Sequence, residues 1–347
     1  MKKIKKSVKI GLFFGGKISQ HLVLVKKAAK KLAVSLDLIS YNRVCFDTDS
    51  GKIMIRGNIG DETKLGYEGK LKDVNDYDVL FFRTTGKHWE EVDLIISSAR
   101  TPVVVDPLVQ FGKPSYACKA WQMLKLKEAG IDVPKSIYGS LWYLYEVMKL
   151  QHSSNHFLGS DECSSTFNVV KKTMVSNESW NFPVIIKGSG GDRGTRVFKA
   201  DSLEELEILV KDLRKTETEE GKRYMLQEYI ANDGDYRVLV LGDKVLGVMK
   251  RFANQDSSEF RNNYSAGGSV EVADLPEEVK KLAVRAAKVC GLVIAGVDVA
   301  FREFDKRKPV IWEVNKGPQF KGFMKATGID VPEEIVKYLV SLSNKPL

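Results

Sequence analysis

The segment from Phe182 to Phe198, FPVIIKGSGGDRGTRVF, places a lysine directly ahead of a glycine-rich stretch. The apolar run that ends at Lys187 predicts a buried strand, and TRVFKA after the glycines predicts a second one. A Walker A loop needs glycine, four residues and then Gly-Lys-Ser/Thr, which no register of GSGGDRGTR supplies. The GxGxxG pattern fails too, because its third glycine falls on Arg193. Such a loop can still hold a triphosphate with backbone N–H groups and Lys187 as a point charge, although a hairpin turn would use glycines as well.

Composition and charge narrow the class of protein. The 347 residues are enough for a sizeable core, and 43% hydrophobic with 29% charged residues is typical of globular proteins. No apolar run is long enough to cross a bilayer, and IGLFF near the start is too short for the apolar region of a signal peptide. We therefore expect no membrane association; a homo-oligomer is left open.

The four cysteines and the net charge indicate the setting and the partners. The cysteines, at positions 45, 118, 163 and 290, lack pair spacing, which favours a reduced, cytoplasmic setting over a disulfide framework. The net charge of +9 suits an anionic ligand or an acidic peptide. The basic residues are not clustered with aromatic ones, so nucleic-acid binding is not expected.

The first 112 residues alternate short apolar runs with helical spacing. The runs SVKIGLFF, LDLISYN, YDVLFFRT and TPVVVD predict buried parallel strands, and SQHLVLVKKAAKKLAVS between the first two predicts a helix. Residues 51–75 are polar and glycine-punctuated, which predicts a small hairpin or excursion. We expect an open α/β domain over residues 1–112.

The second half has a mixed α+β order with no Rossmann repeat. A helix ends at Gly130, and DSLEELEILVKDLRK predicts another, with Ser202 and Glu205 at capping-box spacing. YRVLVLGDKVLGVMKR predicts a hairpin that turns at Gly242, and LVIAGVDVAFREFDKRKPVIWEVN predicts a second that turns at DKRK. Residues 140–181 are the least informative part of the chain. Three side chains in this region could suggest a zinc site, namely His152, His156 and Cys163. They supply too few ligands at regular spacing for such a site, so a polar loop is the preferred interpretation.

The segments AGVDVAF and VIWEVN predict two strands of one hairpin with acidic side chains set among apolar ones. Side chains two apart in a strand face the same side, so Glu313 and Asn315 share a face, and the hairpin puts Asp298 on the neighbouring strand. Two carboxylates and an amide oxygen suit Mg²⁺ that also keeps waters and nucleotide phosphates. A polar cross-strand surface is the alternative, and it is less favoured because carboxylates in apolar strands need a partner to offset desolvation.

The segment between the two hairpins and the strands before it carry a cationic cluster. Such a cluster facing a magnesium nucleotide suits phosphoryl transfer, because charge on the transferred group must be neutralised. Each arginine alone is more often a solvated surface residue, so the interpretation depends on their convergence. The candidate residues of this cluster are Asp235, Arg237, Lys250, Arg251, Arg261, Asn262 and Asn263.

In chain order, these features resemble the ATP-grasp superfamily. The motifs are a strand ending in lysine, the glycine loop, QEYI, DYR, MKR, FRNN…GG, AGVD, EVN and KATGID. They are most similar to the RimK-like carboxylate–amine ligases, which also resemble glutathione synthetases, and the match is dense from about residue 113 to 335. The resemblance implies a mixed α/β and α+β ATP-grasp fold. Its expected parts are an N-terminal pre-ATP-grasp domain (1–112), a central subdomain with a glycine-rich lid (113–228) and a C-terminal subdomain with the metal site (229–347).

The resemblance also implies ATP and Mg²⁺ (or Mn²⁺) as cofactors and roles for the matched positions. Catalytic roles fall to Arg261, Lys250 and Arg237, and the magnesium ligands are Asp298, Glu313 and Asn315. The nucleotide-binding positions are Lys119, Lys187, Gly191, Gly194, Glu228, Tyr229, Ile230, Asp235, Asn262 and Asn263.

The implied reaction has two steps. ATP phosphorylates a carboxylate to give an acyl phosphate, and an amine then displaces phosphate to form an amide. The expected partners are a carboxylate acceptor and an amine donor, with an amino acid such as glutamate added to an acidic peptide or protein tail, or the peptide cross-linked. A small-molecule kinase that phosphorylates a hydroxyl is the alternative on the same scaffold. A nucleotide-binding module without turnover is a third class, which the metal ligands and Arg261 disfavour.

The sequence departs from the family pattern in two segments. After EVN the family continues as Ala-Ser-Pro-Gly-Leu-Glu-Gly, and this chain reads KGPQFKG. The added positive charge beside the metal site favours an anionic acceptor, unless the change is neutral. The unusual positions are Lys316, Gln319 and Lys321 after EVN, and Asp192, Arg193 and Arg196 in the glycine loop.

Overall fold

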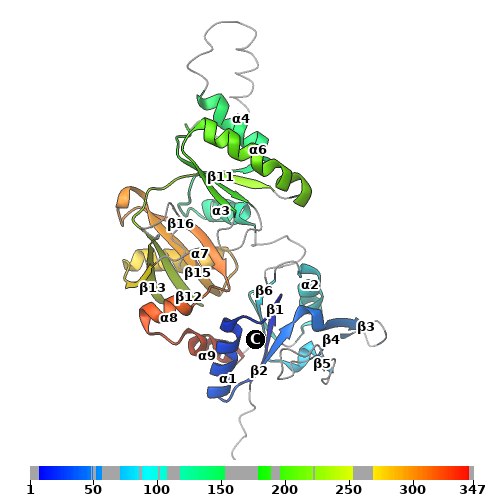
Figure 1. Cartoon of the computed structure of the whole chain (residues 1–347). Helices are drawn as coiled ribbons and strands as arrows, with labels where there is room; N and C mark the ends of the chain where they lie inside the picture. Colours follow the sequence, from blue (N-terminus) through cyan, green and yellow to red (C-terminus); the bar gives the residue numbers. More distant parts are fainter. Residues whose placement is uncertain are drawn as a thin grey trace, which may run out of the picture.

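The structure is a computed structural model, and it consists of three lobes that follow one another along the chain (Figure 1). No helix among the described residues is long and apolar enough to span a membrane. The described residues are 8–47, 49, 52–56, 71–85, 88–100, 102–107, 118–152, 179–188, 196–221, 223–252 and 269–343.

The N-terminal lobe is built on a four-stranded sheet with the order β2-β1-β6-β7, in which all neighbours are parallel. This confirms the parallel strands predicted from the short apolar runs. Helix α1 connects β1 to β2, and α2 connects β6 to β7, so both are crossover helices of an open α/β sheet. The elements are β1 (Lys9–Phe14), α1 (Gln20–Lys31), β2 (Ser35–Ser40), β6 (Val79–Thr84), α2 (Trp89–Ser98) and β7 (Val103–Val105).

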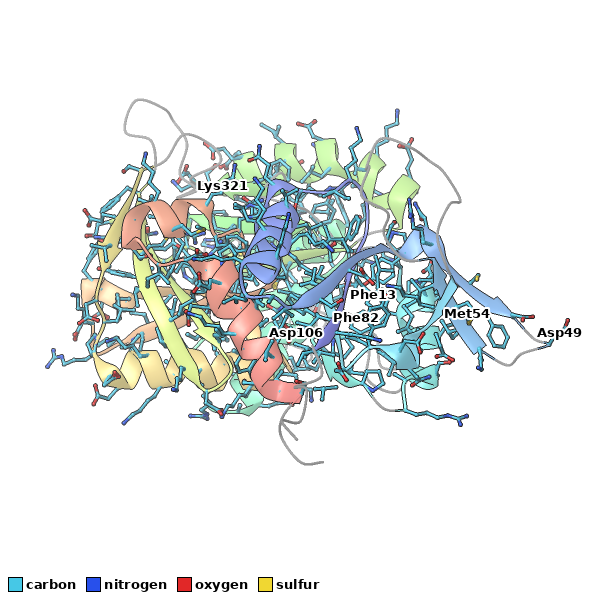
Figure 2. The ribbon with its side chains drawn as sticks, turned by 90° about the horizontal axis from the view of Figure 1, so that it is seen from below. Phe13, Asp49, Met54, Phe82, Asp106 and Lys321 are labelled. Atoms are coloured by element: carbon cyan, nitrogen blue, oxygen red, sulfur yellow. The ribbon has the colours of Figure 1, made fainter. Side chains whose placement is uncertain are left out.

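Aromatic packing holds the α2 side of this sheet. Phe13 and Phe82 stack with ring centroids 4.9 Å apart, and Figure 2 shows them side by side on the neighbouring strands β1 and β6. The excursion predicted for residues 51–75 contributes to a three-stranded antiparallel sheet beside this core. Its elements and the short turns near it are η1 (Tyr41–Arg43), β3 (Val44–Asp47), β4 (Lys52–Arg56), β5 (Leu71–Asp73) and η2 (Val74–Asp76).

The central lobe is a four-stranded antiparallel sheet with the order β10-β9-β11-β8, covered by α4 and α6 at the top of Figure 1. Helix α6 begins as predicted, because the Ser202 hydroxyl accepts from the Glu205 N–H at 3.2 Å. The Glu205 carboxylate reaches the Asp201 N–H, one residue before the expected partner. The elements are β8 (Ser136–Gly139), α4 (Leu141–His152), β9 (Val184–Gly188), β10 (Val197–Ala200), α6 (Leu203–Glu220) and β11 (Tyr224–Glu228).

The C-terminal lobe contains a five-stranded antiparallel sheet with the order β14-β13-β12-β15-β16. The hairpin β12–β13 turns at Gly242, whose φ of +63° suits glycine, and the hairpin β15–β16 turns at residues 305–308; both turns are where the sequence predicts them. Helix α7 packs its buried alanines against one face of this sheet. The elements are β12 (Asp235–Leu241), β13 (Lys244–Phe252), β14 (Ser269–Ala273), α7 (Glu277–Val289), β15 (Ile294–Phe301), η4 (Arg302–Phe304) and β16 (Pro309–Lys316).

Three further helices connect the lobes. Helix α3 (Lys119–Glu128) packs against the core of the C-terminal lobe through Met123 and Leu126. Helix α8 (Lys321–Thr327) covers the face of the five-stranded sheet opposite α7, and α9 (Val331–Ser343) returns to the N-terminal lobe and lies against α1 (Figure 1). The apolar residues of α1, α8 and α9 therefore share one core. The domain limits at residues 112 and 228 stay predictions.

Candidate functional site

The three predicted metal ligands lie together on the C-terminal sheet. Asp298 on β15 is directly opposite Glu313 on β16, and on its other side it is opposite Arg237 on β12. Residues opposite each other in an antiparallel pair have adjacent side chains, so the three form one row across three strands. Asn315 joins them by donating from its Nδ2 to Asp298 Oδ2 at 3.0 Å.

A glycine makes room for this contact. Asn315 is opposite Gly296, and a Cβ on Gly296 would lie 2.9 Å from Pro318 and 3.4 Å from the Arg237 side chain. Any other residue at Gly296 would lie too close to Pro318, so the AGVD motif keeps glycine two residues before the aspartate for steric reasons.

Two arginines bind Asp298. Arg237 donates from Nε to Oδ1 and from Nη2 to Oδ2, both at 2.7 Å, and Arg251 Nη2 lies 3.1 Å from Oδ2. Arg251 also binds the buried carboxylate of Asp235, its cross-strand neighbour. Burial acts to raise the pKa of Asp298, but the charges of Arg237 and Arg251 outweigh it and lower that pKa to about 2. Asp298 is therefore ionised at neutral pH.

Lys250 is not part of this group. Its neighbour across the hairpin is Tyr236, which faces the α7 side of the sheet, whereas Asp235, Arg237 and Arg251 face the other side. The Lys250 Nζ lies 2.8 Å from Asp233 and 4.8 Å from the centre of the Phe252 ring. The structure brings Arg251, not the adjacent Lys250, to Asp298, because alternate residues of a strand point to opposite faces.

Two lysines from outside this sheet lie near these carboxylates. Lys119, the first residue of α3, has its Nζ 3.4 Å from Glu313 Oε1. Lys187 on β9 donates to the Gln227 side chain on β11. Burial and then the charge of Lys119 lower the pKa of Lys187 to about 8, against the opposing attraction of Glu313 and Asp298. The central and C-terminal lobes therefore converge on one cluster of opposite charges.

The predicted adenine-binding residues lie at the connection between β11 and β12. The Glu228 carboxylate accepts from the Lys135 N–H and from Arg302 Nη2, both at 2.8 Å, so this side chain stabilises the connection. Tyr229 lies under Lys199, with 5.2 Å from the ammonium to the ring centre, and Ile230 is buried. Their contact with adenine stays a prediction.

Several predicted site residues lie outside the described residues. Of the unusual charges in the glycine loop, Arg196 is described; its carbonyl accepts from the Gly188 N–H at 2.9 Å. His152 of the zinc hypothesis ends α4, with its ring centre 5.0 Å from that of Phe182. The predicted residues outside the described part of the chain are Gly191, Asp192, Arg193, Gly194, Arg261, Asn262 and Asn263 at the site, and His156 and Cys163 elsewhere.

The segment after Asn315 does not present all of its added charge to solvent. The Lys316 ammonium is buried, and burial lowers its pKa to about 7 despite the attraction of Asp106. Gln319 and Lys321 are exposed, and Figure 2 shows Lys321 at the start of α8. Asp106 accepts from the N–H groups of Val293 and Ile294 at 2.7 and 3.1 Å, and so ties the N-terminal lobe to β15.

The donor atoms fit a hard divalent cation. Among the described residues, no group of three or more His, Cys, Asp or Glu side chains is arranged to hold a metal, so a metal here depends on two carboxylates and one amide. Among the described residues, Asp298 Oδ1 accepts one hydrogen bond, from Arg237, while Oδ2 accepts from Asn315 and both arginines. A carboxylate oxygen has two lone pairs, so Oδ1 can also bind a cation. Oxygen atoms of Asp298, Glu313 and Asn315 would hold Mg²⁺, which keeps waters and phosphates as its other ligands.

Three contacts of this site were not predicted. The sequence places Arg251 in the cationic cluster without a catalytic role, and it predicts no role for Gln227 or Arg302. The motif QEYI contains Gln227 one residue before Glu228, which is a weak sequence signal for a side chain beside Lys187. Nothing in the sequence marks Arg302, whose partner Glu228 is 74 residues away.

A family model described as the RimK-like ATP-grasp domain matches residues 163–339 of this chain. The chain is 39% identical over 159 residues to the "Probable alpha-L-glutamate ligase 1" of Shewanella frigidimarina, which covers 45% of this chain and 50% of the relative. It is 33% identical over 192 residues to the "Probable alpha-L-glutamate ligase" of Cellvibrio japonicus, covering 55% and 61%. The chain thus spans about half the length of the curated relatives it matches.

Solved structures resemble the chain over nearly its whole length. The ATP-grasp ligase PsnB in complex with a minimal precursor has a TM-score of 0.61 at 16% identity, covering 98% of this chain and 99% of PsnB. The macrocyclase MdnC of Microcystis aeruginosa, bound with the precursor peptide MdnA, has a TM-score of 0.60 at 12% identity, covering 96% and 100%. At these identities the likeness establishes the fold, which is the ATP-grasp fold with its N-terminal α/β domain.

Proposed function

Because the chain belongs to the RimK-like ATP-grasp family, we propose that it is an ATP-dependent carboxylate–amine ligase that forms an amide through an acyl phosphate. The observation that carries the proposal is the ion pair between Lys119, the first residue of α3, and Glu313, the cross-strand neighbour of Asp298. Lys187 of the central lobe lies near enough for the charges of Lys119, Glu313 and Asp298 to act on its pKa. Lysines beside metal-binding carboxylates are the arrangement that holds a magnesium nucleotide by its phosphates.

The residues have separate tasks in the proposed reaction. Lys119 and Lys187 bind the nucleotide phosphates, and Gln227 holds Lys187 in place. Mg²⁺ bound at Asp298, Glu313 and Asn315 would supply positive charge to the phosphate oxygens. Arg237 and Arg251 keep Asp298 ionised and fixed for that purpose. Arg261 is proposed to neutralise the acyl phosphate.

The reaction balances without a protein nucleophile. A substrate carboxylate oxygen attacks the γ-phosphorus of ATP, and ADP leaves. The amine nitrogen then attacks the carbonyl carbon, the C–O bond to phosphate breaks, and the nitrogen loses a proton. The protein's contribution is orientation and charge neutralisation, which are the main sources of rate in such transfers.

For the substrates, we propose an amino acid such as glutamate and an acidic peptide or protein tail. The curated relatives are named alpha-L-glutamate ligases, and PsnB and MdnC were solved with precursor peptides. The net charge of +9 favours acidic partners by long-range attraction. ATP with Mg²⁺ is supported by the PsnB structure that contains Mg and ADP.

The proposal is tested by ADP release screened over amino acids and acidic peptides, with mass spectrometry of the products. A ligase gives a product whose mass is the sum of two substrates minus water. A stable phosphorylated product without an amide would instead establish the kinase alternative. ATP bound without ADP release under any condition would support the module without turnover.

A further inference from the structure

Arg83, the arginine of the strand β6, is a buried cation at the boundary between two lobes. Only 4% of the residue is exposed. Its Nη2 donates to the carbonyl oxygens of Gly317 at 3.3 Å and Pro318 at 2.8 Å, and its guanidinium carbon lies 5.2 Å from the centre of the Phe320 ring. Arg83 therefore joins the N-terminal sheet to the segment that follows the metal ligand Asn315.

The other guanidinium nitrogen has no partner among the described residues. Nη1 of Arg83 is buried and makes no hydrogen bond there. Burial lowers the pKa of Arg83 to about 10, and no carboxylate of the described chain pairs with it. Arg251 is also buried and Arg237 is partly buried, and each has an aspartate within hydrogen-bond distance. Of these three arginines, Arg83 is the one without an anionic partner among the described residues. An unpaired buried cation is unfavourable, so an anion that binds at Arg83 would remove this cost.

The position of Arg83 in the fold favours a ligand. β6 lies on the opposite side of β1 from β2, so the strand order reverses between β1 and β6. Ligands of open α/β sheets bind outside the carboxyl ends of the strands at this kind of reversal, and Arg83 is the second-last residue of β6.

Arg83 is also close to the proposed reaction centre. Its partner Gly317 is two residues after Asn315, and two residues of chain span at most about 7 Å. Gly317 has a φ of +57°, and a Cβ there would lie 2.8 Å from the Arg83 carbonyl oxygen, so glycine allows the close approach of the two chains.

We propose that Arg83 binds a substrate carboxylate other than the one that is phosphorylated. This inference deepens the proposed ligase function and depends on it for the identity of the reaction. A guanidinium keeps its positive charge and donates hydrogen bonds to carboxylate oxygens, and Nη1 supplies donors that no described residue uses. In the proposed function the nucleotide phosphates are bound by Lys119 of α3 and Lys187 of the central lobe, which leaves Arg83 of the N-terminal lobe for the second substrate. The carboxylate is either the α-carboxylate of an amino acid or a side-chain carboxylate of an acidic peptide.

The test compares Arg83→Gln and Arg83→Lys with wild type, using thermal shift in the presence of Mg²⁺ and a non-hydrolysable ATP analogue. The probes are L-glutamate, L-glutamine, the α-amide of glutamate and a tetraglutamate peptide. We expect Arg83→Gln to weaken binding of the best carboxylate probe at least tenfold, with less than twofold change for the nucleotide, and Arg83→Lys to be intermediate. The matched control is Arg307→Gln, since Arg307 is exposed and pairs with Asp305. Should Arg83→Gln fail to fold, Arg83→Lys is read alone.

The amides distinguish the two carboxylates. If wild type binds the α-amide of glutamate weakly but binds glutamine as well as glutamate, Arg83 binds the α-carboxylate. If wild type binds glutamine weakly but binds the α-amide as well as glutamate, Arg83 binds a side-chain carboxylate. The inference is overturned if Arg83→Gln weakens binding of the nucleotide instead. It is also overturned if every carboxylate probe binds Arg83→Gln as tightly as it binds wild type. Ligation with an unchanged KM in Arg83→Gln would overturn it while the ligase proposal stands. If Arg83→Gln loses glutamate binding but wild type shows no ligation, the Arg83 site stands and the proposed ligase function is contradicted.

Discussion

Lys119 at the start of α3 and Glu313 on β16 form an ion pair, with 3.4 Å between Nζ and Oε1. Lys119 is a predicted phosphate-binding residue, and Glu313 is a predicted metal ligand. Their contact joins the two halves of the proposed site. When a magnesium nucleotide binds, phosphates and metal would each replace one partner of this pair. The ion pair therefore keeps both side chains oriented before the nucleotide binds.

Lys119→Met is expected to weaken binding of the magnesium nucleotide at least tenfold, or about 1.4 kcal/mol. It should change the free energy of unfolding by less than about 1 kcal/mol, because both partners are partly exposed, at 22% and 30%. Calorimetric titration and urea unfolding measure the two quantities. Lys125→Met on the same helix is the control, since Lys125 pairs with Glu128 on the surface. Equal nucleotide affinities of the two variants would contradict the role of Lys119.

Arg251 and Lys250 are adjacent and should differ sharply. Arg251→Gln leaves Asp235 and Asp298 buried with less positive charge, so we expect a loss of about 3–5 kcal/mol in unfolding free energy and a large loss of turnover. Lys250→Gln should cost less than about 1 kcal/mol, because its partner Asp233 is 68% exposed. Urea unfolding and ADP release on both variants check this. A greater loss of turnover in Lys250→Gln than in Arg251→Gln would support the catalytic role predicted for Lys250.

Lys187 predicts a pH dependence of stability without nucleotide. The pKa of Lys187 is lowered from 10.5 to about 8 in the folded protein. The buried ammonium therefore destabilises the folded protein to its full extent below about pH 8. Between pH 8 and about 10.5 the unfolded chain binds more protons at this residue than the folded one, so stability should rise with pH. Lys187→Met should lack this rise in urea unfolding at pH 7, 8, 9 and 10. The same rise in the variant would assign it to another group.

Most of the fold could be predicted from local patterns. The runs around β1, β6 and β7 are short and mostly apolar, which is typical of buried parallel strands. Gly242 marks its hairpin turn because a positive φ there suits glycine. The row of Asp298 and Glu313 follows from strand alternation on a hairpin.

The contacts that the sequence could not predict depend on register and on distant segments. Whether Arg251 or Lys250 faces Asp298 depends on the pairing of β12 with β13, which shifts between Leu239 and Val240. Arg83 belongs to a strand that is otherwise apolar, and its partners Gly317 and Pro318 come more than two hundred residues later. Such pairs form only when the lobes pack, and no local pattern encodes them.

The central claim is that a carboxylate is activated by phosphorylation before an amine attacks it. The most direct measurement uses a substrate whose carboxylate carries ¹⁸O, with mass spectrometry of the released phosphate and of the product. An acyl phosphate transfers one of the two carboxylate oxygens to phosphate, so with both oxygens labelled we predict one ¹⁸O per released phosphate and one ¹⁸O kept in the amide, with Glu313→Gln producing neither product. Unlabelled phosphate, or label retained in a phosphorylated product without an amide, would contradict the ligase mechanism.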